Sequence, residues 1–349
     1  MNTIEQRLAA LREVMRREHL SAFIFPSTDP HNGEYIPEHW EGRKWVSGFN
    51  GSAGTAVVTL HSAALWTDSR YFLAAEEQLR GTEYRLMKLK VEGTPSITQW
   101  LGIELADVDS PEVGVDGMVN SCAAVEAMIY ELRHEGGITV MTNFDPLREV
   151  WTDRPAIPNH KVEIQPIEFA GESCSSKLKR IRTVLADRHV EGTFVTALDD
   201  IAWITNMRGT DVHCNPVFVA YLLISPTKAT LFIDPDKLNR QTLDYLNAEG
   251  VTIAPYADVA KGLASYDGYN ILLDPDTVNY TLYNKVSCHE RERGTSPIPA
   301  MKAIKNDAEI AGYHRAMKRD GVAMVKFLSW LKPAVERGGQ TEMSIDRKL

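Results

Sequence analysis

The sequence predicts an α/β protein made of two copies of one domain, each a mixed β-sheet flanked by helices. Two observations lead to this fold class: a pattern of helices and strands that occurs twice, and strand pairs whose connections are too short for a wholly parallel sheet. A third observation, the change of pattern after residue 300, indicates that a different segment begins there.

The first helix of each copy is marked by apolar residues at helical spacing that lead to a histidine. These residues are Leu8, Leu11, Met15 and His19 in the first copy and Leu178, Ile181, Leu185 and His189 in the second. The offset is 170 residues at every position. Because this period is too long for a solenoid, it favours duplication of a whole domain.

Capping residues precede both helices. Thr3 and Gln6 have the spacing of a capping box, and Ser175 or Ser176 is expected to cap the second helix.

Strands follow these helices in the same order in both copies. We expect strands at 22–25, 55–60, 63–67 and 113–116, and again at 193–196, 218–224, 229–233 and 271–274. A polar loop with aspartates follows the first strand of each copy, at Asp29 and at Asp199-Asp200. The second and third strands form a tight pair, whereas the later strand precedes a helix, so the sheet is mixed.

Residues 151–177 between the copies have the proline, glycine and serine content of a linker. We place the domains at 1–160 and 161–300, with a third segment at 301–349. In that segment Asn306 and Glu309 are expected to cap a long helix that ends at Pro333 and Gly338-Gly339. One face of this helix carries Ile310, Tyr313, Met317, Met324, Leu328 and Leu331. A single helix cannot bury a core, so this segment either docks on the rest or opens a longer domain.

Composition narrows the class of protein. The formal net charge of -9 argues against nucleic acid or an anionic membrane as the main partner. The longest apolar run, near 217–224, is too short to span a membrane and is typical of a buried strand. The first twenty residues lack the apolar stretch of a secretory signal, and the four cysteines form no CxxC pair. We therefore expect a reduced, cytoplasmic protein.

Several motifs occur in a characteristic order along the whole chain. They are SGFNGSAGTA at 47–56, LWTDSRYF at 65–72, WTDRP at 151–155, ALDDIAW at 197–203, NMRG at 206–209, DVHCNPVF at 211–218 and KAIKN at 302–306. Together they resemble the three-domain Xaa-Pro aminopeptidases (aminopeptidase P) of peptidase family M24. By this resemblance, 1–160 and 161–300 are creatinase N-terminal-like domains and 301–349 begins a pita-bread metallopeptidase domain.

The resemblance also implies an activity. Members of this family release the N-terminal residue from peptides with proline at position 2, and they are commonly homodimers. Two divalent metal ions, usually manganese, are held by two Asp, one His and two Glu, and they drive two-metal hydrolysis.

The chain departs from the family pattern at its catalytic end. All five ligands would lie well beyond the first pita-bread helix, and the segment after residue 300 offers only the scattered Asp307, His314, Asp320 and Asp346. We therefore expect no catalytic residue, no metal ligand and no cofactor in this chain. It would be the non-catalytic N-terminal region of a longer enzyme, shaping the active-site cleft and supporting dimerisation.

The loop 208–216 is the segment most associated with function, because polar and titratable residues precede a buried strand there. Family architecture makes Arg208, Asp211 and His213 candidates for residues that face the cleft. The alternative is a structural turn with a satisfied histidine. A Cys214–His213 nucleophile is disfavoured, because neighbouring residues on a strand point to opposite faces.

Three other segments favour structural roles. We expect Asp68 to cap a helix that begins at Ser69 or Arg70, in preference to a catalytic pair with Arg70. The loop 48–54 lacks the lysine of a phosphate loop and leads into a strand, so it is a turn with Trp45 and Phe49 as apolar anchors. His31, Glu34, Glu38 and His39 match no zinc spacing and predict a surface loop.

Two rival hypotheses remain. A natural truncated protein without catalysis would serve oligomerisation or peptide binding, and a well-packed C-terminal helix would favour it. An exposed apolar face on 306–332 would instead indicate a missing partner domain. A creatine-type amidinohydrolase is weaker, because those enzymes have one N-terminal domain and this chain shows two.

Overall fold

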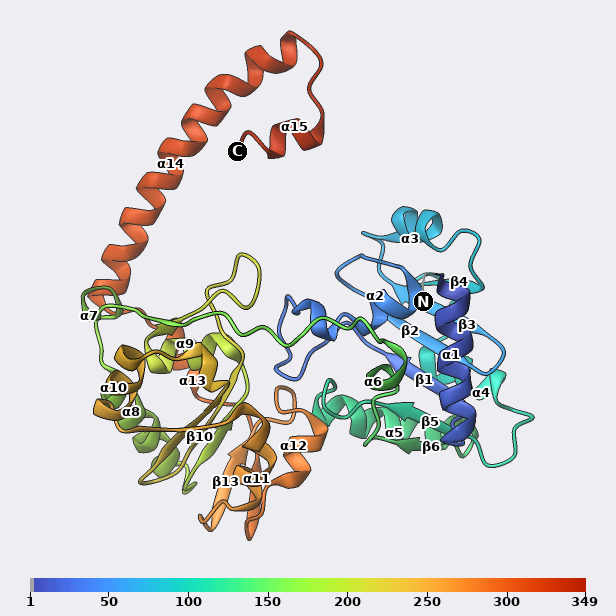
Figure 1. Ribbon diagram of the computed structural model, residues 1–349, viewed down its shortest axis with the longest axis horizontal. Helices are drawn as coiled ribbons and strands as arrows, with labels where there is room; N and C mark the ends of the chain where they lie inside the picture. Colours follow the sequence, from blue (N-terminus) through green and yellow to red (C-terminus); the bar gives the residue numbers. More distant parts are fainter. Residues whose placement is uncertain (1–2) are drawn as a thin grey trace.

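The computed structural model describes residues 3–349. It shows two α/β domains side by side, joined by an extended linker, with one long helix that leaves the second domain and projects away from both sheets (Figure 1). We call the two units domain I and domain II.

Domain I contains a six-stranded mixed sheet in the order β4-β3-β2-β1-β5-β6. The strands β2 and β3 form the tight antiparallel pair, whereas β1 is parallel to β5 and β3 is parallel to β4. Its elements are α1 (Ile4–Arg17), β1 (Ala22–Phe25), η1 (Glu38–Trp40), α2 (Gly42–Ser47), β2 (Thr55–Thr59), β3 (Ala63–Thr67), α3 (Phe72–Gln78), β4 (Tyr84–Lys88), α4 (Ile97–Glu104), β5 (Glu112–Val115), α5 (Cys122–Gly136), β6 (Thr139–Met141) and α6 (Leu147–Val150).

Domain II repeats this sheet in the order β12-β11-β10-β8-β13-β14, with β10 and β11 as the tight antiparallel pair. Its elements are β7 (Glu163–Ile164), α7 (Ile167–Ala170), α8 (Cys174–Asp187), β8 (Thr193–Val195), α9 (Leu198–Thr205), β9 (Met207–Arg208), β10 (Ala220–Ile224), β11 (Ala229–Ile233), η2 (Pro235–Lys237), α10 (Arg240–Ala248), β12 (Val251–Ala254), η3 (Tyr256–Asp258), α11 (Val259–Ala264), β13 (Asn270–Leu273), α12 (Tyr280–Lys285) and β14 (Glu290–Arg293). The matching strand orders confirm the predicted duplication and the mixed-sheet fold class.

The repeat extends to the backbone at the end of the first helix. His19 and His189 both have φ 58°, and in each copy the next residue donates its amide to the carbonyl five positions earlier. This is a Schellman-type end, in which a left-handed residue lets the chain turn sharply into the first strand.

Two local predictions were wrong in domain II. The N-cap of α8 is Ser173, whose side chain accepts from the amide of Ser176, so the helix begins earlier than Ser175 or Ser176 would allow. Asp199 and Asp200 lie in the first turn of α9 and not in a loop. Acidic residues are stabilised there by the positive end of the helix dipole. In domain I, Thr3 caps α1 as predicted.

Each sheet has an apolar core on both faces because its central strands are buried on both sides. In β1, Phe23 and Phe25 face the cluster that includes Leu8 and Leu11 of α1. Ile24, between them, joins the opposite cluster, where α4 and α5 pack. The buried residues of domain II form two clusters around its own sheet.

The domains meet through equivalent corners of the two copies, where a strand turns into a helix. Ser121, the N-cap of α5, forms an antiparallel bridge with Asn279, the N-cap of α12. The flanking hydrogen bonds form two matched pairs: Cys122 to Val278 with Tyr280 to Asn120, and Ala123 to Pro275 with Thr281 to Gly117. Within each pair, one hydrogen bond becomes the other when the equivalent residues of the two domains are exchanged. The two domains are therefore related locally by a pseudo-two-fold axis.

After domain II the chain forms α13 (Ile298–Ala303), the long helix α14 (Asp307–Glu336) and the short α15 (Glu342–Asp346). The predicted capping box of Asn306 and Glu309 is present. The predicted end at Pro333 is wrong, because α14 continues to Glu336 with the proline inside it, and only Gly338 and Gly339 follow the end. No helix among residues 3–349 has the length and apolar character needed to cross a membrane.

Candidate functional site

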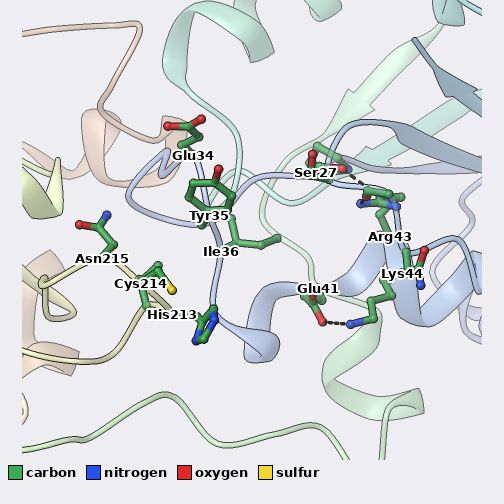
Figure 2. A pocket seen from close by; sticks show the side chains of 15 residues that line it. Ser27, Glu34, Tyr35, Ile36, Glu41, Arg43, Lys44, His213, Cys214 and Asn215 are labelled. Atoms are coloured by element: carbon green, nitrogen blue, oxygen red, sulfur yellow. Dashed lines mark hydrogen bonds and ion pairs between the residues drawn. The ribbon is translucent and has the colours of Figure 1, made fainter. Parts of the chain in front are cut away.

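A cleft of about 680 Å³ lies between the two domains (Figure 2). One wall is the segment between β1 and β2 of domain I, and the other is the loop 212–215 of domain II. Its polar lining includes Glu34, Tyr35, Glu41, Lys44, His213 and Asn215. In each domain, the wall of the cleft therefore belongs to the connection between the first strand of the sheet and the tight strand pair.

Arg43 on α2 organises the floor of this cleft on the side of domain I. Its guanidinium is buried and donates to the carbonyl oxygens of Phe49 and Gly51 and to Oγ of Ser27. Burial lowers the pKa of Arg43 to about 10. The loop 48–54 folds around this cation, which confirms the prediction of a structural turn.

Gly51 is required in that turn by space. A Cβ at this position would lie 2.3 Å from Cζ of the Phe49 ring, which is fully buried. Trp45 is also buried, and it stacks on Trp151 at 5.5 Å. Both aromatic residues are core anchors, as predicted.

On the opposite wall, His213 and Cys214 are exposed at the tip of the loop. Cys214 has φ 57°, a left-handed conformation, so the two residues lie in a turn and not on a strand. Across the cleft, Lys44 pairs with Glu41 at 2.6 Å (Figure 2). The accessible groups therefore carry both charges, and hydrogen-bond donors and acceptors are available on both walls.

Asp211 lies behind this loop, 6% exposed, and is held by four donors. Its Oδ2 accepts from the amide of Val219 at 2.7 Å and from Nζ of Lys237. Its Oδ1 accepts from the amide of His160 and lies 3.2 Å from Nδ1 of that ring. Lys237 is 1% exposed, and burial lowers its pKa against the opposing effect of Asp211. This buried ion pair fixes the base of the 212–215 loop.

Arg208 also lies outside the main cleft. Its guanidinium donates to the carbonyl oxygens of Ala202 and Met207 at 2.7 and 2.8 Å. Burial lowers its pKa, which Glu309 partly opposes. It lines a smaller hollow of about 290 Å³ where domain II meets α14. Of Arg208, Asp211 and His213, the structure places only His213 on the interdomain cleft, and their role toward a substrate stays a prediction.

The prediction of a surface loop at 31–39 was wrong for His31, which is 2% exposed. This ring of domain I inserts into domain II. Nδ1 lies 3.0 Å from the carbonyl oxygen of Thr196, so Nδ1 carries the proton, and Nε2 accepts from the Tyr256 hydroxyl at 2.9 Å. The ring packs on Tyr221 at 4.4 Å. Burial lowers the pKa of His31 below its usual 6.5. His39, by contrast, is half-buried and bonds to the carbonyl oxygen of Pro155.

The predicted cap at Asp68 was also wrong. Helix α3 begins at Phe72, too far along the chain for Asp68 to reach its first amides. Asp68 instead accepts from the amide of Arg70 and forms a two-point ion pair with its guanidinium, which lowers the pKa of the carboxyl to about 2. The turn at 68–71 delays the start of the helix.

The residues at 3–349 do not fit a metal centre. They contain no group of three or more His, Cys, Asp or Glu side chains arranged to hold a metal ion.

Sequence reasoning missed the residues that build the cleft from beneath. Neither Arg43 nor Lys237 was identified from the sequence, and the partners of Lys237, Pro158 and Asp211, are distant in sequence. The only signal was position: Lys237 follows Asp234-Pro235, a tight turn directly after a buried strand.

The fold and its two-walled cleft define the class of this protein: a chain that carries two tandem copies of one α/β domain. Family models for the creatinase/prolidase N-terminal domain match residues 7–150 and 153–309. The chain belongs to the creatinase/prolidase N-terminal domain family and carries two copies of that domain.

Over nearly its whole length the chain is similar to Xaa-Pro aminopeptidases. It is 36% identical to Xaa-Pro aminopeptidase 1 of Dictyostelium discoideum over 99% of this chain and 57% of the relative. It is 33% identical to aminopeptidase P2 of Arabidopsis thaliana over 99% of this chain and 53% of the relative. The chain thus spans about half the length of the curated relatives it matches.

A solved structure shows the same arrangement. The X-prolyl aminopeptidase of Caenorhabditis elegans, described as a cytosolic enzyme with a di-nuclear active site, matches with a TM-score of 0.92 and 30% identity. The match covers 100% of this chain and 59% of that one. The similarity to Xaa-Pro aminopeptidases inferred from the motifs is therefore confirmed.

Proposed function

We propose that this chain forms the two N-terminal domains of an Xaa-Pro aminopeptidase, which removes the first residue from peptides with proline at position 2. The observation that carries the proposal is the match to the C. elegans enzyme over 100% of the chain, at a TM-score of 0.92. A match of this extent includes the placement of domain I against domain II and the start of α14.

The surface of α14 supports a further domain beside it. Of the residues of α14, all of which are described, only Ala334 is buried. Met317 and Leu328 are 60% and 54% exposed, and Ile310, Tyr313 and Met324 are exposed on the same helix. An apolar surface of this length is typical of a protein interface. We propose that a pita-bread catalytic domain, opened by 301–349, covers it.

In this proposal the catalytic chemistry belongs to that further domain. The two divalent metal ions, manganese by family resemblance, would be held there, since the described residues of this chain offer no metal centre. Domains I and II would form a wall of the cleft that admits a free peptide N-terminus and excludes folded protein. We propose that His213, at the tip of the 212–215 loop, reaches the active-site cleft into which the peptide N-terminus enters.

The homodimer and the cytoplasmic location are proposed from the family resemblance and from the description of the C. elegans enzyme as cytosolic. Analytical ultracentrifugation of the purified chain would measure whether it forms a dimer.

The direct test is a fusion. Residues 1–349 would be joined to the part of the Dictyostelium relative that lies beyond the matched region, and assayed on an Arg-Pro-Pro peptide with added manganese. We expect metal-dependent release of arginine, no release from the matched Arg-Ala-Pro peptide, and no activity from 1–349 alone. A folded, metal-loaded fusion without activity, or cleavage by 1–349 alone, would contradict the proposal.

A further inference from the structure

Helix α14 is anchored to domain II only at its beginning. Residues 311–333 are exposed or half-buried throughout, and the helix points away from both domains (Figure 1). At 1.5 Å per residue its thirty residues extend over about 45 Å. The direction of the whole helix is therefore set by the contacts at residues 302–315, which we call the elbow.

The first contact of the elbow is an ion pair. Nζ of Lys302 donates to Oδ1 of Asp200 at 2.6 Å and also to Asp199, both in the first turn of α9. The side chain of Asp200 is 4% exposed, and burial raises its pKa against the opposing effect of Lys302. A buried carboxylate with one cation partner fixes α13 firmly on α9.

The second contact uses the capping residue of α14 for two tasks. Oδ1 of Asn306 accepts from the amide of Glu309 at 3.0 Å, which caps the helix. Nδ2 of the same side chain donates to the carbonyl oxygen of Ala170 at 2.8 Å, at the end of α7. One amide group therefore joins the start of one helix to the end of another.

Gly171 makes this contact possible. It has φ +70°, and a Cβ at this position would lie 2.2 Å from Oδ1 of Asn306. Because of both the backbone conformation and the space, any other residue here would be strained and would displace the Asn306 side chain from this contact. Two contacts then steady the first turns: Nε1 of Trp203 donates to Glu309 at 3.3 Å, and Arg315 lies over the ring of Phe169 at 5.6 Å.

We propose that the elbow positions the catalytic domain: Asp200, Lys302, Asn306 and Gly171 set the angle at which α14 leaves domain II, and so the place of the catalytic domain relative to the interdomain cleft. These are positioning residues, and the inference rests on the proposed function. A tilt of 10° at the elbow moves residue 326, twenty residues along the helix, by about 5 Å.

The test measures this angle without using activity. Spin labels would be placed at Asp244→Cys on α10 and Lys326→Cys on α14, with the two cysteines that are not buried, Cys214 and Cys288, changed to serine. We expect one narrow distance distribution in this parent. Asn306→Asp keeps the cap but sets an acceptor against the Ala170 carbonyl, so the distribution should shift by about 5 Å or broaden.

Further variants keep the test falsifiable. Gly171→Ala should shift the distance at least as much as Asn306→Asp. Lys302→Met should broaden it and Lys302→Arg should largely restore it. Lys228→Met removes an exposed lysine of the same domain, whose nearest carboxylate is 4.0 Å away, and should change nothing. An unchanged distribution in folded Asn306→Asp and Lys302→Met would overturn the inference.

The active fusion provides a second readout. Asn306→Asp should raise KM for Arg-Pro-Pro several-fold at unchanged metal content, because the wall of the cleft moves while the metal centre does not. An inactive fusion would contradict the proposed function. The spin-label distances would still test whether the elbow sets the angle of α14. A KM equal to that of the parent fusion would show that the elbow does not position the catalytic domain.

Discussion

Domains I and II have the same sheet topology, but the segments that follow their first strands make different contacts. In domain I, residues 26–54 reach out to the neighbouring domain through His31 and wrap around Arg43. In domain II, most of residues 196–219 pack on their own sheet, where α9 contacts β10 and carries the elbow, and only Thr196 and the 212–215 loop face domain I. The comparison shows that the duplicated sheets are a common frame, and that loops at one position of this frame have acquired separate roles.

Two buried cations, Arg43 of domain I and Lys237 of domain II, are also satisfied in different ways. Arg43 of domain I is surrounded by neutral oxygen acceptors, whereas Lys237 of domain II is paired with the buried carboxylate of Asp211. Loss of the Arg43 guanidinium leaves carbonyl groups unpaired, whereas loss of the Lys237 ammonium leaves the charge of Asp211 unpaired. The second loss should cost more.

The largest expected effect tests this difference. Lys237→Met should destabilise domain II by about 3–5 kcal/mol, because it leaves Asp211 buried without a counter-charge. Arg43→Met should cost domain I less, about 1–3 kcal/mol for unpaired carbonyl groups. Hydrogen exchange by mass spectrometry, which reports the domains separately, would measure both. The double variant Asp211→Asn/Lys237→Met should lose less than the sum of its single changes, and an additive result would contradict a coupled pair.

The interface between the domains should be sensitive to pH through His31. Its pKa is lowered by burial, so the docked state holds a neutral ring, whereas the undocked ring takes up a proton below about 6.5. The stabilisation is therefore complete above that pH and is lost progressively as the pH falls below it. The groups around the ring are Asp29, Tyr221 and Tyr256, with Asp211 and Lys237 at longer range.

His31→Gln tests this contribution. It should weaken the interface by about 2–3 kcal/mol at neutral pH and flatten the loss of hydrogen-exchange protection between pH 7 and pH 5. The matched control is His39→Gln, because His39 is half-buried and its ring contacts the linker at Pro155 and Trp40 of its own domain. If the wild-type interface keeps its protection at pH 5, or if His31→Gln retains the full pH dependence, the role assigned to His31 is wrong.

A smaller effect concerns the pseudo-two-fold axis. Ser121 and Asn279 are equivalent N-caps that face each other, but Asn279 is buried and also donates to the carbonyl oxygen of Pro30 at 3.0 Å. Asn279→Ala should therefore cost about 2 kcal/mol and Ser121→Ala about 1 kcal/mol. Thermal unfolding of both variants would measure this. Equal costs would mean that the contact with Pro30 adds nothing to the cap.

The smallest effect should be the same in both copies. His19→Gly and His189→Gly each relieve a left-handed conformation at φ 58° and should each stabilise the chain by about 0.5–1 kcal/mol. Asn270 donates to the carbonyl oxygen of His189, a contact that the backbone keeps in the glycine variant. Opposite signs in the urea midpoints of the two variants would show that the repeat is not equivalent at these positions.

The sequence by itself determined the features that depend on local chemistry. The paired helices, the tight strand pairs, the caps at Thr3 and Asn306 and the glycine turn at 48–54 all follow from spacing and residue type within a few positions. The motifs, read together, were specific enough to indicate the family. The helix starts were misplaced by two or three residues, at the cap Ser173 and at Phe72, where several polar side chains that could cap a helix lie close together.

Only the tertiary structure decided which polar residues are buried. His31 resembled a surface residue because its partners, Thr196 and Tyr256, lie in the other domain. Asp211 resembled a cleft residue because its partner Lys237 comes from a different turn. Likewise, the pseudo-two-fold axis and the elbow depend on contacts between groups more than 100 residues apart, such as Asn306 and Ala170. Such contacts carry no periodicity along the chain, so the sequence shows which groups need a partner and the fold alone supplies it.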